Sequence, residues 1–151
     1  MTHRLSMVQF EDNLARFYGF AAEQGWAAAE GAIGECGRAT ASFTEASRGT
    51  PIGQPPGGMY SDVWDSDRLP HTGTHTESAE FTGFSGYEAR AHPRHKTSVI
   101  PPQHWEHAAN IVNTESGLHV VDWTARQLDS QAAFPRVVSV DEFKKNWTRS
   151  G

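Results

Sequence analysis

Apolar residues in the first third of the chain recur at the spacing of an amphipathic helix. They follow one another at steps of four, three and four residues: Phe10, Leu14, Phe17 and Ala21. This spacing places them along one face of a helix. Ser6, with Gln9 three residues later, has the spacing of a capping box, and Gly25 is a typical stop signal. We therefore predict a helix between Ser6 and Gly25.

A second helix is predicted from about Cys36 to Ser47. Its apolar side is formed by three residues, namely Ala39, Phe43 and Ala46. Three glycines lie close to its start, at positions 31, 34 and 37. Because glycine adopts backbone conformations that other residues avoid, the chain can turn sharply before this helix begins.

The middle of the chain shows little periodicity. Seven of the eight prolines fall between Pro51 and Pro102, mixed with Gly, Ser, Thr and His. Phe81, Phe84 and Tyr87 are spaced like anchors for a loop. We expect a long Pro/Gly-rich insertion at about residues 50–104, which forms a wall or a lid over the functional site.

The last third predicts β-structure followed by a helix. Residues 107–113 and 118–124 are rich in Ile, Val and Trp, and the turn-forming residues 114–117 separate them. This pattern is typical of a β-hairpin. Residues 136–140 indicate another short strand. We expect Asp141 to cap a final helix that contains Phe143 and Trp147.

Length and charge narrow the class of protein. The chain has 151 residues, which fits a single domain over residues 1–151. Its 18 acidic and 13 basic residues give a net charge of -5, which argues against nucleic acid as a partner. No apolar run reaches the roughly 18 residues that cross a membrane, and no signal peptide is visible in the first ten residues. We expect a cytoplasmic protein, or an effector delivered into a target cell.

The only cysteine lies at a position that favours reactivity. Cys36 falls in the first turn of its predicted helix, where unpaired backbone N–H groups and the helix dipole stabilise a thiolate. A lone cysteine is more often a small buried hydrophobic residue. With one cysteine, neither an internal disulfide nor a Cys-rich zinc site is possible.

The predicted hairpin supplies two further groups. If its turn is centred on residues 115 and 116, Ala109 faces Asp122 and His107 faces Thr124. His107 and Asp122 are then diagonal neighbours on one sheet face, with Cβ atoms about 7 Å apart. A carboxylate at this distance can orient an imidazole whose other nitrogen faces a nucleophile. His119 faces Val112 on the other side of the sheet and cannot take this role.

These segments resemble the papain-like and transglutaminase-like cysteine superfamily. The resemblance rests on the cysteine that opens a helix, on HAANIV at residues 107–112 and on HVVDWTARQ at residues 119–127. The segment 121–127 is most similar to papain-fold domains of bacterial and phage origin, including toxin domains of polymorphic systems. The resemblance implies an α+β fold in which a helix-borne cysteine packs on a small antiparallel sheet. It also implies that Cys36 is the nucleophile, His107 the base and Asp122 the residue that orients His107.

The chain departs from the family at the oxyanion hole. The backbone N–H of Cys36 is the expected first donor, whereas papain relatives place a glutamine about six residues before the cysteine as the second. Here the nearest upstream glutamine is Gln24, twelve residues away. Asn110 and Gln127, which lie near the hairpin, are further candidates for a polar neighbour. Transglutaminase-like members often carry Trp two residues after the histidine, where this chain has Ala109.

The sequence therefore predicts a cysteine hydrolase or acyl transferase: a protease, a deamidase or a transglutaminase-like enzyme. It would form a thioester with a protein or peptide substrate, such as a host or competitor protein, and would need neither cofactor nor metal. Two alternatives stay open. One is a non-catalytic phage or bacterial binding or inhibitor module that retains the fold, and the other is a metal hydrolase that uses His71 and His75. The oligomeric state leaves no trace in the sequence.

Overall fold

The computed structural model describes residues 3–53, 68–83 and 106–150 and has an α+β fold. In chain order, its elements are α1 (Met7–Glu23), α2 (Ala29–Ala32), α3 (Cys36–Ser47), β1 (Thr76–Gly83), β2 (Glu106–Thr114), β3 (Gly117–Asp122), the 3-10 turn η3 (Ala125–Gln127), β4 (Arg136–Ser139), α5 (Val140–Phe143) and β5 (Trp147–Arg149). None of the helices in this described part is long and apolar enough to span a bilayer.

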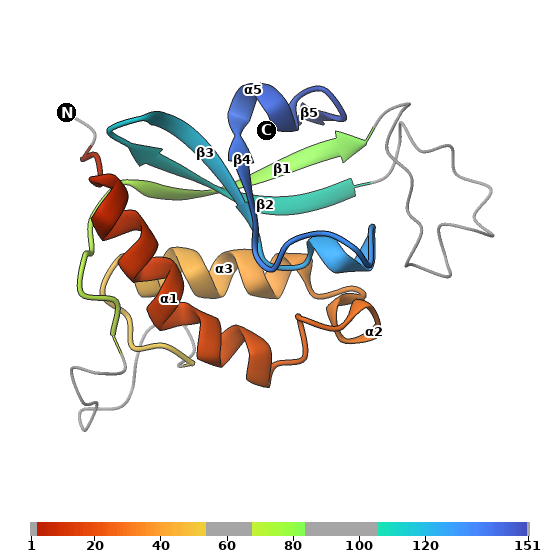
Figure 1. Cartoon of the computed structure of the whole chain (residues 1–151), viewed down its shortest axis with the longest axis horizontal. Helices are drawn as coiled ribbons and strands as arrows, with labels where there is room; N and C mark the ends of the chain where they lie inside the picture. Colours follow the sequence, from red (N-terminus) through yellow and green to blue (C-terminus); the bar gives the residue numbers. More distant parts are fainter. Residues whose placement is uncertain (1–2, 54–67, 84–105, 151) are drawn as a thin grey trace.

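The strands form one antiparallel sheet with the order β4-β3-β2-β1-β5. Figure 1 shows α1 and α3 on one side of the sheet and α5 on the other. Each side has its own apolar core. The core under α1 and α3 includes Phe17, Trp26, Phe43 and Trp123, whereas the core under α5 includes Phe81, Val120, Phe143 and Trp147. The sheet is therefore covered on both faces.

The first helix confirms the sequence prediction. The Ser6 side chain accepts a hydrogen bond from the N–H of Gln9, and the Gln9 side chain accepts one from the N–H of Ser6. These two bonds form the capping box, which satisfies backbone donors that a helix N-terminus otherwise leaves unpaired. At the other end, the chain leaves the helix through Gly25, whose φ of 90° suits glycine.

The helix α3 begins at Cys36 and ends at Ser47, as predicted. The turn before it depends on two of the expected glycines. Gly34 has a φ of 75°, and a Cβ on Gly31 would lie 2.1 Å from the carbonyl oxygen of Gly25. No side chain fits at Gly31 without movement of the backbone. Close packing of the chain therefore fixes the point at which Cys36 enters the helix.

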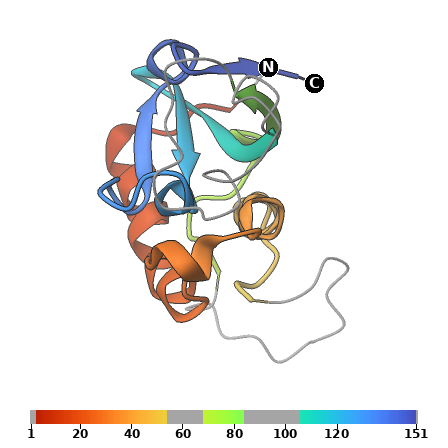
Figure 2. The same ribbon diagram turned by 90° about the vertical axis from the view of Figure 1, so that its right-hand side faces the viewer.

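The hairpin also has the predicted register. Asn110 pairs with Val121, and Val112 pairs with His119. Figure 2 views the molecule from the end at which α3 and β2 begin, and β2 crosses above the start of α3 there. The N-terminal end of β2 is thus brought to the first turn of the helix. This crossing places the histidine-bearing end of the hairpin beside Cys36.

Two parts of the sequence prediction differ from the structure. The expected insertion at 50–104 contains β1, a central strand at residues 76–83, and Phe81 is buried in that strand instead of anchoring a loop. Tyr87 and Phe84 lie outside the described residues.

The prediction of a C-terminal helix that reaches Trp147 is wrong beyond one turn. The observed helix, α5, is capped by Ser139, whose hydroxyl accepts a hydrogen bond from the N–H of Glu142, and Asp141 lies in its first turn. It ends at Phe143, and Trp147 belongs to β5, which pairs with β1. The gain from extending the sheet outweighs the helical spacing of the two aromatic residues.

Candidate active site

The Cys36 thiol lies at the first residue of α3 and is partly exposed. The first backbone hydrogen bond of the helix runs from the Ala39 N–H to the Glu35 carbonyl oxygen. The N–H groups of Cys36, Gly37 and Arg38 therefore precede the helical ladder. The Cys36 thiol faces the His107 side chain and the backbone of Ala108, and both favour the thiolate. The thiol is thus accessible and lies beside groups that stabilise its anion.

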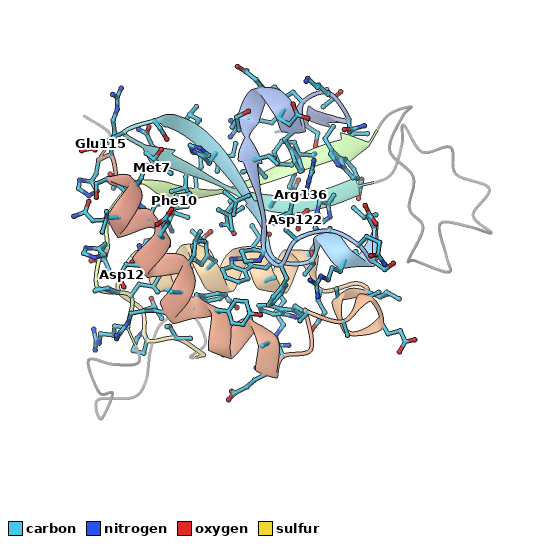
Figure 3. The ribbon with its side chains drawn as sticks, viewed as in Figure 1. Met7, Phe10, Asp12, Glu115, Asp122 and Arg136 are labelled. Carbon is cyan, nitrogen blue, oxygen red and sulfur yellow. The ribbon has the colours of Figure 1, made fainter. Side chains whose placement is uncertain are left out.

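The His107 imidazole connects the thiol to a buried carboxylate. Its Nε2 atom lies 2.6 Å from Oδ2 of Asp122, and each side chain is 2 % exposed. Because Asp122 occupies Nε2, Nδ1 is the nitrogen left for the Cys36 sulfur. Sulfur, imidazole and carboxylate therefore follow one another in series. Asp122 lies at the end of the hairpin remote from Glu115 in Figure 3.

Backbone and side-chain donors hold the Asp122 carboxylate in place. Its Oδ1 atom accepts from the Thr124 N–H at 3.1 Å and from the Thr124 hydroxyl at 3.4 Å. The Gln127 amide donates to the same hydroxyl at 3.1 Å, and the Gln127 carbonyl accepts from the Gly34 N–H at 3.3 Å. One hydrogen-bonded chain thus links the acid to the turn that leads into Cys36.

The Trp147 ring packs against His107. The two ring centroids are 5.2 Å apart, and Trp147 is 1 % exposed. Phe81 lies directly across from His107 in the β1–β2 register and is also buried. These apolar rings keep water from the imidazole–carboxylate pair, which strengthens the attraction between the two groups.

The pKa values of Cys36 and His107 shift in opposite directions. Burial raises the pKa of Cys36, but the hydrogen bond and the charge of His107 outweigh it, so the pKa falls below the ordinary 9.0. For His107, burial alone would lower the pKa. The adjacent Asp122 carboxylate, with a smaller contribution from Cys36, raises the pKa of His107 from 6.5 to about 10. Both shifts favour a thiolate–imidazolium pair.

A pocket of about 310 Å³ opens beside the thiol. Its lining comes from the start of α3, from β1 and β2, and from the residue that follows β5, namely Cys36, Gly37, Glu80, Phe81, Glu106, His107, Ala108 and Ser150. Glu80, Glu106 and Ser150 belong to no motif that the sequence shows. The alternation of polar and apolar residues along 78–83 is the signal that identifies β1 and, with it, Glu80.

None of the three candidate oxyanion residues lines this pocket. The Gln24 carbonyl accepts from Arg38. Asn110 is fully buried under α3, where its amide donates to the Thr40 carbonyl oxygen and to the Thr44 hydroxyl. Gln127 is engaged by Thr124 and Gly34, as described above. All three connect parts of the scaffold, and the backbone N–H groups at the start of α3 are the donors nearest the sulfur in sequence.

The histidines considered for a metal site have other partners. The His71 Nε2 atom lies 2.9 Å from the Asp12 carboxylate. In His75, Nε2 donates to the His71 carbonyl oxygen at 3.1 Å, and Nδ1 lies 2.8 Å from the Thr76 hydroxyl. Within the described ranges, no three His, Cys, Asp or Glu side chains gather in a way that could hold a metal ion. His92, His95 and His104 lie outside those ranges.

In chemical terms, the arrangement pairs a nucleophile with a base that is itself oriented by an acid. No protein-family model matches the chain, and no curated protein or solved structure matches it either. The geometry of the site is therefore the basis on which a function can be assigned.

Proposed function

We propose that the chain is a cysteine-dependent hydrolase or acyl transferase that acts on amide bonds. The observation that supports this proposal is the series of contacts from the Cys36 sulfur through His107 to Asp122. A purely structural role would account for a buried histidine or for a buried aspartate taken by itself. It does not account for a buried histidine–aspartate pair that ends at a thiol exposed in a pocket.

The chemistry proceeds in two steps. The Cys36 thiolate attacks the carbonyl carbon, and the N–H groups at the start of α3 stabilise the oxyanion. The tetrahedral intermediate collapses to a thioester as the C–N bond breaks, and the leaving amine takes the proton of the His107 imidazolium. His107 then accepts a proton from water, or from an acceptor amine, that attacks the thioester. The product is released, and the Cys36 thiolate and the His107 imidazolium are regenerated.

The fold supports the family expected from the sequence. In the proposed papain-like or transglutaminase-like arrangement, a helix begins at the nucleophile and packs on an antiparallel sheet that carries the base and the acid. Here α3 packs against β1 and β2, and the hairpin β2–β3 carries His107 and Asp122. As a member of that superfamily, the protein would take a protein or peptide as substrate.

Alkylation of the thiol tests the proposal directly. We expect the alkylation of Cys36 by iodoacetamide to have its midpoint below pH 9.0. Intact mass spectrometry over pH 4 to 11 measures the rate of labelling. Cys36→Ala must remain unlabelled, and Cys36→Ser should fold normally while losing any peptidase or deamidase activity. A thiol that titrates at or above the ordinary value of 9.0 would contradict the proposal.

The alternative of a non-catalytic binding module gives a different result. A partner that binds in stoichiometric amounts to wild type and to Cys36→Ala alike, with an unreactive thiol in wild type, would favour the module over the enzyme.

A further inference from the structure

A second hollow adjoins the Cys36 pocket and follows α3 away from its first turn. It has a volume of about 380 Å³ and shares Gly37, Glu80 and Ala108 with that pocket. Its other lining residues are Thr40, Ala41, Ser78 and Ala79. We call the two hollows together the α3–β1 groove. Because most of these side chains are small, a polypeptide backbone can approach the floor of the groove closely.

One wall of the α3–β1 groove is a strand with an incompletely paired edge. β5 pairs with β1 only from Phe81 to Gly83, and the Ser150 N–H adds a hydrogen bond to the Glu80 carbonyl oxygen. Backbone groups alternate between the two edges of a strand, so Ser78 directs its N–H and C=O to the same edge as Glu80. No other described strand pairs with β1 there. An edge of this kind can accept an extended peptide as an added strand.

Two carboxylates lie at the end of the groove that contains the thiol. Glu80 pairs with Ala108, and Glu106 pairs with Thr82. The two glutamates are therefore diagonal neighbours on one sheet face, with Cβ atoms about 7 Å apart. Both are exposed, and both line the Cys36 pocket. Neither forms an ion pair with another described residue.

The described arginines near this end are paired with other acids. Arg38 forms its ion pair with Glu35, and Arg149 forms one with Glu77. The two carboxylates of the pocket are thus left without a compensating charge from either arginine. Because the thiolate–imidazolium pair has no net charge, the two glutamates make the pocket negative on balance, and such a pocket attracts cationic ligands.

We propose that the substrate of Cys36 is an extended polypeptide segment with a lysine or arginine side chain, a proposal that rests on the proposed function. Its backbone lies along the edge of β1 at Ser78, and its cationic side chain lies between Glu80 and Glu106. The strand edge selects an extended main chain, and the carboxylates select the charge. Glu80 and Glu106 are therefore specificity-determining residues beside the reacting thiol.

Binding to the Cys36→Ala variant tests this proposal independently of catalysis. The probes are two pools of fluorescent heptapeptides, acetylated and amidated at their ends, with lysine or norleucine at the centre and neutral residues elsewhere. Fluorescence anisotropy should show the lysine pool binding roughly threefold to tenfold more tightly, as expected for a cation beside two exposed carboxylates. Glu80→Gln and Glu106→Gln should each reduce that ratio, and together they should bring it close to one.

Two further variants separate charge from shape. Ala41→Trp fills the groove from an exposed position on α3, so it should weaken both pools equally. Glu115→Gln is the matched control, because Glu115 lies in the turn of the hairpin, far from Asp122 in Figure 3; it should change neither pool. Circular dichroism checks that each variant is folded.

Three results would overturn the proposal. They are equal binding of the two pools, a lysine preference that survives the double glutamine variant, and binding of acetyl-lysine methylamide as tight as that of the lysine pool. Failure of the proposed function is read separately, from iodoacetamide labelling of wild-type Cys36, which needs neither the strand edge nor the two glutamates.

Discussion

Two buried histidines lie at opposite ends of the β1–β2 pair, and their pKa values shift in opposite directions. His107 is buried and lies beside a thiol and a carboxylate. His75 is 2 % exposed, and both of its ring nitrogens meet neutral oxygens. The pKa of His107 is raised to about 10, whereas burial lowers the pKa of His75 below 6.5. Burial is thus common to both sites, and the charge of the partner differs.

This difference separates a buried histidine held in its neutral form from one held in its protonated form. The contacts of His75 satisfy a neutral ring, with Nε2–H as a donor and Nδ1 as an acceptor from the Thr76 hydroxyl. The contacts of His107 instead favour the charged ring, because Asp122 is acidic and the Cys36 thiolate is an anion. A buried imidazole becomes a candidate base only where such charges compensate for its desolvation.

The largest expected effect comes from removal of the His107 ring. In His107→Ala, burial continues to raise the pKa of Cys36 while the hydrogen bond and the charge of the imidazole are lost. The pKa should rise to 9.0 or above, and iodoacetamide labelling at pH 7 should slow about tenfold or more, since each pKa unit is a factor of ten in thiolate. Labelling rates by mass spectrometry measure this.

His75→Gln is the matched control for that experiment. It changes the other buried histidine and should leave the labelling rate of Cys36 as in wild type. Equal rates in wild type and His107→Ala would show that the imidazole does not activate the thiol.

A smaller effect is expected when only the carboxylate is neutralised. Asp122→Asn keeps the shape of the side chain but removes its charge, so the pKa of His107 should fall from about 10 by about 1–3 units. NMR titration of the His107 ring measures this change in pKa. The pKa of His75, measured in the same titration, should be the same as in wild type. A pKa of His107 that stays near its wild-type value would mean that Asp122 is not its main partner.

The sequence predicted the site through local patterns. Gly34 and the apolar spacing after Cys36 indicated where α3 begins, and the four-residue turn at 114–117 indicated the register of the hairpin. Once these two elements are correct, the relation of His107 to Asp122 follows from strand geometry. The packing of α3 across the start of β2 is a tertiary contact, so the meeting of Cys36 with His107 rested on the resemblance.

The remainder of the fold depends on contacts that local patterns do not contain. β1 has alternating polarity at only a few positions, and it lies in a proline-rich region that favoured a loop. Trp147 follows Phe143 at helical spacing, but β1 offers a strand edge that β5 pairs with. Gln127 was expected near an oxyanion, and its actual partners, Thr124 and Gly34, come from segments that meet only in the folded chain.

The smallest expected effect concerns stability at acid pH, where the two histidines contribute with opposite signs. In the unfolded chain His75 titrates near 6.5, and in the folded protein its pKa is lower. The contribution of His75 to the free energy of unfolding is therefore complete above pH 6.5 and is lost as pH falls through the folded pKa. The contribution of His107 is complete below 6.5 and is lost as pH rises toward about 10. The free energy of unfolding of wild type, measured in urea at pH 8 and at pH 5, should therefore lose a contribution from His75 that the His75→Gln variant lacks. His3 and His71 face the same ring, so His3→Gln serves as the comparison variant. If His75→Gln and wild type lose the same free energy between these two pH values, the neutral contacts of His75 do not control its protonation.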